Sequence, residues 1–113
     1  MAALSFYEDK AGVAFLDIST GEFYVAEGDL KYISKLIHDY SPSEILYARS
    51  NDSLFQDNFK TKAYTFRLDD WVFQKDFALE KLNHHFGTKS LKGFGISNMN
   101  MSIISAGAIL HYL

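Results

Sequence analysis

The nearly continuous apolar segment Gly12–Ile18 constrains the fold more than any other feature of this chain. Asp17 is its only charged residue, and such a run is typical of a strand buried on both faces of a sheet. Ser19-Thr20-Gly21 then indicates a turn, and Glu22–Ala26 predicts a strand that returns as an antiparallel hairpin. With another strand over Leu4–Glu8, the first 26 residues predict a three-stranded meander.

The spacing of apolar residues becomes helical after this meander. Asp29 is a suitable N-cap, and the apolar residues that follow predict a helix over 29–40. Ser41-Pro42 ends this helix, because the residue before a proline is disfavoured in the α region. Further elements are predicted as strands at Glu44–Ala48 and Lys62–Phe66, with a short helix or loop at Asn51–Asn58 between them. Apolar strands that flank a helix favour crossover connections and therefore a parallel part of the sheet.

The next predicted helix runs from Asp76, which is placed to cap it, to Phe86. Its apolar stripe comprises Ala78, Leu79, Leu82 and Phe86, and Gly87 follows as a stop signal. Gly93-Phe94-Gly95 then indicates a tight turn, not a phosphate-binding loop.

A last helix is predicted to begin at Asn98 or Asn100 and to continue through Tyr112. It reaches Leu113 without a Gly, a Pro or a basic last turn. We therefore expect a chain cut from a longer protein, with this last helix truncated.

The order of these elements is that of a ribonuclease H-like α/β fold. We predict one domain over residues 1–113, with a mixed sheet in which an antiparallel meander is followed by parallel strands and flanked by helices. A match of element order carries little information about function by itself.

Composition and charge restrict the possible partners. The chain has no Cys, so disulfides and thiolate metal sites are excluded, and it has no segment typical of a signal peptide or membrane span. We expect a soluble, cytoplasmic chain. Eleven Lys and Arg against fourteen Asp and Glu give a net charge of -3, which argues for weak or no DNA binding by this chain alone. Residues 58–113 are the more basic half, which leaves open a mildly basic face for an acidic partner.

Asp17 is the first candidate for chemistry, because a strand-end aspartate can hold a metal ion in ribonuclease H-like nucleases. Two-metal hydrolysis needs several carboxylates, and Asp69 and Asp70 are the possible further ligands. The alternative interpretation is structural: Asp17 accepts hydrogen bonds from the turn that follows it. We favour the structural role, and keep a divergent metal-dependent nuclease as the alternative function.

No other motif indicates catalysis, a metal or a cofactor. The adjacent His84 and His85 point about 100° apart on a helix and cannot chelate one ion well, and His38 and His111 are isolated in the sequence. There is no nucleophile elbow and no phosphate loop. We expect no catalytic residue, metal ligand or cofactor in this domain.

The side of helix 76–86 opposite the apolar stripe is a candidate partner surface. It carries Phe77, Glu80, Lys81 and His84. A large aromatic among polar groups can anchor a partner protein. The plain alternative is that Phe77 folds over the start of the helix while the other three side chains are solvated.

Several segments resemble the DNA mismatch repair protein MutS family. Gly12–Phe23 is similar to that family's G-x-A-x-x-D-x-S-T-G-E-F segment, and Ser41–Leu46 resembles its P-x-E-[IV]-[LV] step. The resemblance continues in the same order through Leu82–Thr88, Leu91–Gly95 and Ala106–Leu113. The matching region is the connector domain, or domain II, of the family.

This resemblance implies a ribonuclease H-like connector without nuclease activity. It would lie between the mismatch-recognition domain and the core and ATPase domains, relay conformational state between them, and offer a docking surface to MutL. Mismatch reading, ATP and Mg²⁺ would, by this resemblance, belong to other parts of a bacterial, nucleoid-associated parent protein, and this chain has no Walker A loop.

Overall fold

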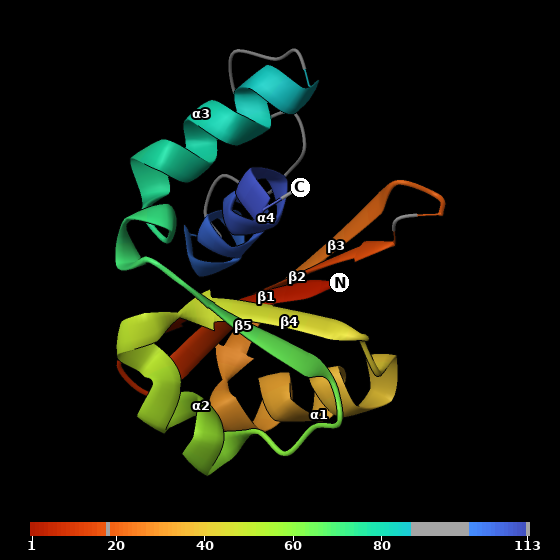
Figure 1. Ribbon diagram of the computed structural model, residues 1–113, viewed down its shortest axis with the longest axis vertical. Helices are drawn as coiled ribbons and strands as arrows, with labels where there is room; N and C mark the ends of the chain where they lie inside the picture. Colours follow the sequence, from red (N-terminus) through yellow and green to blue (C-terminus); the bar gives the residue numbers. More distant parts are fainter. Residues whose placement is uncertain (18, 87–99, 113) are drawn as a thin grey trace.

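The computed structural model describes residues 1–17, 19–86 and 100–112, which form a five-stranded mixed sheet with helices on both faces (Figure 1). The strands are β1 (Ala2–Tyr7), β2 (Lys10–Asp17), β3 (Glu22–Asp29), β4 (Glu44–Ala48) and β5 (Tyr64–Leu68). The helices are α1 (Leu30–Tyr40), α2 (Asp52–Asn58), α3 (Lys75–Phe86) and α4 (Asn100–Tyr112), with short 3-10 turns η1 (Arg49–Asn51) and η2 (Asp70–Val72). No helix among these residues combines the length and apolar character needed to cross a bilayer.

The strand order β3-β2-β1-β4-β5 confirms the predicted fold class. The first three strands are antiparallel neighbours, whereas β4 runs parallel to β1 and β5 runs parallel to β4. Strand β5 starts at Tyr64, two residues after the predicted Lys62. The reason is local: Thr61 Oγ1 accepts a hydrogen bond from Ala63 N (3.1 Å), which holds the chain in a turn before the strand begins.

Helices α1 and α2 cover one face of the sheet over large side chains. The buried residues of this core are Ala2, Leu4, Ala11, Val13, Phe15, Ile33, Ile37, Ile45, Tyr47, Phe55 and Phe59. Phe55 of α2 stacks on Tyr47 with ring centroids 4.3 Å apart, and on Phe59 at 5.4 Å. Stacked rings of this size bury a large apolar area, so this core depends on a few bulky groups.

Helix α1 has the predicted ends. Asp29 Oδ1 accepts a hydrogen bond from Tyr32 N (2.7 Å), which satisfies one of the unpaired N–H groups of the first turn. Ser41 adopts a left-handed conformation (φ 47°) and its N–H donates to Ile37 O (2.9 Å). The predicted helix over 29–40 and its stop at Ser41-Pro42 are therefore confirmed.

Helices α3 and α4 cover the other face, over a small-residue core in which five of the eleven buried residues are alanines and the rest are leucine, isoleucine or valine. The buried residues of this core are Ala3, Ala14, Leu16, Leu46, Val72, Ala78, Leu82, Ile103, Ala106, Ala108 and Ile109. Gly107 of α4 lies so close to α3 that a Cβ there would stand 2.5 Å from Ala78 Cα. Helix α4 lies between the sheet and α3 (Figure 1). Helix α3 is thus an outer layer that is held mainly through α4.

A buried hydroxyl pair joins α4 to the sheet. Ser105 Oγ lies 3.0 Å from Gly12 O and 3.2 Å from Ser5 Oγ, and Ser5 Oγ donates to Met101 O (2.5 Å). Both serines are buried, so these hydrogen bonds replace the water that the hydroxyls lose on folding. They tie α4 to β1 and β2 over one helical turn, from Met101 to Ser105.

Candidate partner-binding surface

The start of α3 differs from the sequence prediction. The helix begins at Lys75, so Asp76 lies in its first turn and is not the N-cap. Ala78 N donates to Gln74 O (3.0 Å), which puts the first helical hydrogen bond two residues earlier than expected. The carboxylate of Asp76 still lies where the positive end of the helix dipole favours it.

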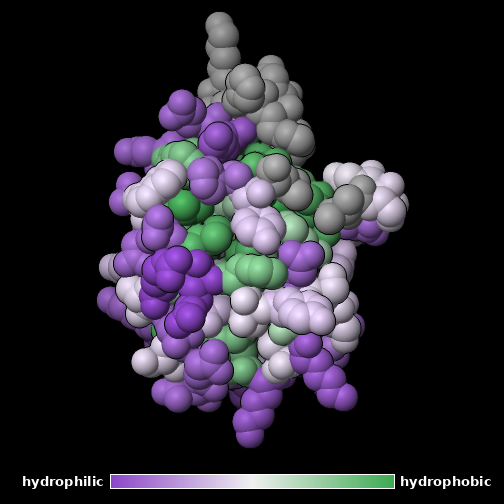
Figure 2. Space-filling model, in the orientation of Figure 1, coloured by the Kyte–Doolittle hydropathy of each residue, from purple (hydrophilic) through white to green (hydrophobic). Residues whose placement is uncertain are grey.

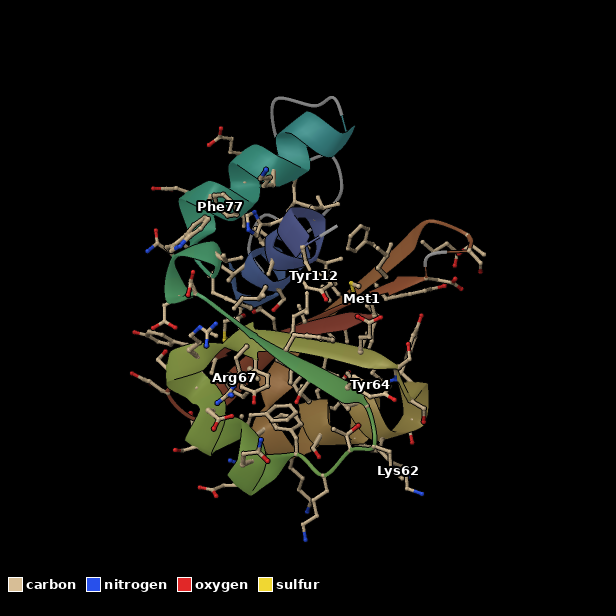
Figure 3. All side chains as sticks on the ribbon, viewed as in Figure 1. Met1, Lys62, Tyr64, Arg67, Phe77 and Tyr112 are labelled. Atoms are coloured by element: carbon tan, nitrogen blue, oxygen red, sulfur yellow. The ribbon has the colours of Figure 1, made fainter. Side chains whose placement is uncertain are left out.

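Phe77 does not lie on an outward face, and this part of the prediction is wrong. Its ring packs edge-to-face against Trp71 of η2 and against His111 of α4, each with centroids 5.3 Å apart, and it contacts the small-residue core. Trp71 and His111 also meet at 5.3 Å. The three rings join η2, the start of α3 and the last turn of α4. Figure 3 labels Phe77. The cause is non-local, because His111 is far from Phe77 in the sequence.

The outer side of α3 is charged. Glu80 is exposed, and Lys81 is half-buried with its Nζ 5.5 Å from the centroid of the Phe77 ring, a cation–π contact. His84 lies within α3, but its side chain is outside what the structure describes, as are Gly87, Gly93-Phe94-Gly95 and Asn98. Partner binding by Phe77, Glu80, Lys81 and His84 stays a prediction.

Sequence reasoning missed Trp71. Its side chain is 50% exposed although the ring is held by Phe77 and His111. Half-exposed tryptophans in ordered surroundings are typical anchors of protein interfaces. A single Trp after two aspartates was the only sequence signal for it. We refer to Trp71, Glu80 and Lys81 as the α3 face.

Asp17 has the structural role that the sequence favoured. Its Oδ1 accepts from Ser19 N (3.0 Å) and Ser19 Oγ (2.7 Å), and its backbone carbonyl accepts from Gly21 N (2.7 Å). Gly21 has φ 75°, a left-handed conformation that suits glycine. The hydroxyl of Ser19, more than the backbone donors, lowers the pKa of Asp17 below its ordinary value.

The carboxylates considered for a nuclease lie at opposite ends of the sheet. Asp17 ends β2 and pairs with Glu22 in register, whereas Asp69 and Asp70 follow β5, whose last residue Leu68 is paired with Ala48. Strand β2 is antiparallel to β1, whereas β4 and β5 run in the same direction as β1. The end of β2 and the end of β5 therefore lie at opposite edges, separated by the length of the strands. The three aspartates cannot share a metal ion.

The end of the sheet where β1 and β4 finish holds a hollow of about 580 Å³ instead. Ligands of open α/β folds commonly bind at such an edge. Here the lining includes Ser5, Ser50 and Asp70, but Ser5 is bonded to Met101 O and Asp70 Oδ1 accepts from Ser50 N (3.1 Å). Asp69 is paired with Arg49 (3.2 Å). Among the described residues, no three His, Asp or Glu side chains gather to hold a metal ion.

The fold and these sites define a mixed α/β domain of the ribonuclease H-like class. Comparison with known proteins goes further: the family described as MutS domain II matches residues 1–113. The chain is 52% identical to the DNA mismatch repair protein MutS of Bacteroides thetaiotaomicron, 50% to that of Bacteroides fragilis and 47% to that of Flavobacterium johnsoniae, over its whole length in each case. It spans 13% of the length of each relative.

The chain therefore belongs to the MutS domain II family, as its sequence resemblance indicated.

Proposed function

We propose that this domain is a non-catalytic connector in a MutS-type mismatch repair protein. It links the mismatch-recognition domain to the core and ATPase domains, relays their conformational state, and docks MutL. The observation that carries the proposal is the position of the α3 face. The exposed Glu80 and the half-buried Lys81 lie on the outer helix α3, which packs on α4, and the half-exposed Trp71 of η2 packs against Phe77 at the start of that helix.

The relay follows from how α3 is held. The last turn of α4 contacts the start of α3 through His111 and Phe77, and the two helices meet closely again at Gly107 and Ala78. A displacement of the end of α4 therefore moves α3, and a partner bound to α3 biases the position of α4. Such reciprocity is what coupling between two sites requires.

In this proposal the domain uses no cofactor of its own. ATP and Mg²⁺ act in the ATPase part of the parent protein, and DNA is held chiefly by other domains. The parent protein works in the bacterial cytoplasm, at the nucleoid.

The proposal is tested by exchanging the charges of the α3 face in the full-length protein. Glu80→Lys combined with Lys81→Glu is expected to lower MutL recruitment to mismatched DNA by roughly five- to tenfold, as loss of an interface anchor region does. The matched control is Glu8→Lys with Lys10→Glu, an exposed pair in the β1–β2 turn. Unchanged recruitment by the first variant, at equal mismatch binding and ATPase activity, would remove the α3 face from the proposal.

A further inference from the structure

Two adjoining hollows lie on the α1 and α2 side of the molecule, away from the α3 face. The smaller, about 460 Å³, lies between α1 and the end of α2, and the larger, about 730 Å³, lies between the end of α1 and the segment before β5. They share His38 and Lys60 in their linings, so they form one continuous surface. We call it the α1–α2 hollow.

The charge of this hollow opposes that of the chain. Its lining contains four lysines, Lys31, Lys35, Lys60 and Lys62, against a single acid, Asp57. The residues that line the hollow thus have a formal net charge of +3, although the whole chain has a net charge of -3. All other residues together therefore have a net charge of -6. The net charge of the chain argues against DNA binding, but the charges are distributed unevenly and this surface is basic.

The lysines are free to meet a ligand. All four side chains are exposed, and none takes part in an ion pair among the described residues, where the pairs are Arg49–Asp69 and Arg67–Asp52. Lys31 and Lys35 lie one turn apart on the same side of α1. Lys62 projects away from the body of the molecule in Figure 3, and Figure 2 shows hydrophilic side chains protruding from this end.

The chemistry of the lining indicates the kind of partner. The smaller hollow is lined by Lys31, Ser34, Lys35, His38, Asp57, Asn58 and Lys60, with no apolar side chain among them. The larger hollow adds Lys62 and several hydroxyls, and its one exposed large apolar side chain is Tyr64. Lys, Ser and Asn side chains are the usual ligands of nucleic-acid phosphates, and they make up most of the exposed lining. Lysine acts as a flexible point charge, which suits contact without sequence preference.

We propose that the α1–α2 hollow contacts the sugar–phosphate backbone of duplex DNA, weakly and without reading the sequence. This rests on the proposed function, because it assumes a domain that works in a protein held on DNA. The hollow and α3 lie on opposite sides of the sheet (Figure 1), so DNA and a protein partner can be held at the same time.

Binding of this chain to a fluorescent duplex of 20 base pairs, followed by anisotropy, tests the proposal. Four lysine–phosphate contacts give a slope of log Kd against log salt of about 3.6, hence about a hundredfold weakening between 50 and 200 mM salt. Lys35→Gln with Lys60→Gln is expected to lower that slope by about 2 and to raise Kd at least tenfold at 50 mM salt. Asp57→Asn, which removes the only acid of the hollow, is expected to tighten binding.

The matched control is Lys10→Gln with Lys75→Gln, two exposed lysines outside the hollow that change the net charge equally. Equal weakening by both pairs, or poly-glutamate bound as tightly as DNA, would overturn the proposal. In the full-length protein, a photo-crosslinking amino acid at position 35 should label DNA and one at position 75 should not. The reverse result would also overturn it. Lys35→Gln with Lys60→Gln is expected to leave MutL recruitment unchanged. A failure of the DNA-binding proposal can therefore be told apart from a failure of the proposal for the α3 face.

Discussion

The two faces of the sheet are built in different ways. The α1–α2 face is packed with large rings, and its first helix has a side-chain cap at one end and a left-handed residue at the other. The α3–α4 face combines alanines and one glycine with leucines, isoleucines and a valine. Helix α4 is apolar over most of its circumference because it lies between the sheet and α3. The ends of α1 on the first face are therefore specified by local sequence, whereas the positions of α3 and α4 depend on close contact between segments that are distant in the chain.

The largest loss of stability is expected from removing a large ring of the α1–α2 face. Phe55→Ala deletes the centre of the stack between Tyr47 and Phe59 and should cost about 3–5 kcal/mol of unfolding free energy, because the cavity cannot close around rigid rings. Urea unfolding followed by circular dichroism measures it. Tyr112→Ala, a partly exposed ring on α4, is the control and should cost much less. A loss below about 1 kcal/mol for Phe55→Ala would show that the stack is not the basis of this core.

Adding one carbon to the small-residue face is the next test. Gly107→Ala puts a Cβ 2.5 Å from the Ala78 backbone and should cost about 1–3 kcal/mol through overpacking. Gly28→Ala is the matched control, since the atoms nearest its new Cβ belong to the Tyr32 ring, at 2.6 Å, and that half-exposed side chain can rotate away. Equal losses in thermal unfolding would contradict the close approach of α3 and α4.

The cap of α1 tests how far the first face is locally specified. Asp29→Ala removes the acceptor of the Tyr32 N–H and should cost about 1 kcal/mol. Asp39→Ala, an exposed acid near the other end of the same helix, should be neutral or slightly stabilising, because an acid there opposes the helix dipole. Both are measured by denaturant unfolding. A cap effect no larger than that of Asp39→Ala would mean that tertiary packing alone positions the helix.

The smallest expected effect concerns pH at the β2–β3 turn. The pKa of Asp17 is lowered in the folded chain, so its carboxylate contributes stability above the unfolded pKa of about 4 and loses it as pH falls through the lower folded value. The Tm difference between the native chain and Asp17→Asn should be greatest near neutral pH and should vanish in strong acid. A difference that is independent of pH would falsify this role of the carboxylate.

Features that depend on local hydrogen bonds were predictable from the sequence, whereas those that depend on contacts between distant segments were not. The cap at Asp29, the stop at Ser41 and the turn after Asp17 are local hydrogen-bonding patterns, and the structure confirms each of them. The start of α3 and the orientation of Phe77 were wrong, because Gln74 accepts the first helical bond and rings from η2 and α4 enclose Phe77.

Basic residues were also hard to place from the sequence. Counting by halves of the chain put Lys31 and Lys35 in the acidic half, and the fold brings them beside Lys60. A crossover helix and a loop almost thirty residues later meet only once the parallel strands are formed.

The hydrogen bond of the Ser105 hydroxyl fixes the position of α4 along its own axis. Sliding the helix by a turn along its axis would take this hydroxyl away from Gly12 O and leave it without a partner in an apolar interior, at a cost of about 1–3 kcal/mol. Tilting the helix about the same point keeps the hydrogen bond. We therefore expect α4 to rock about Ser105 more readily than it slides along the sheet, and such rocking would move α3 with it.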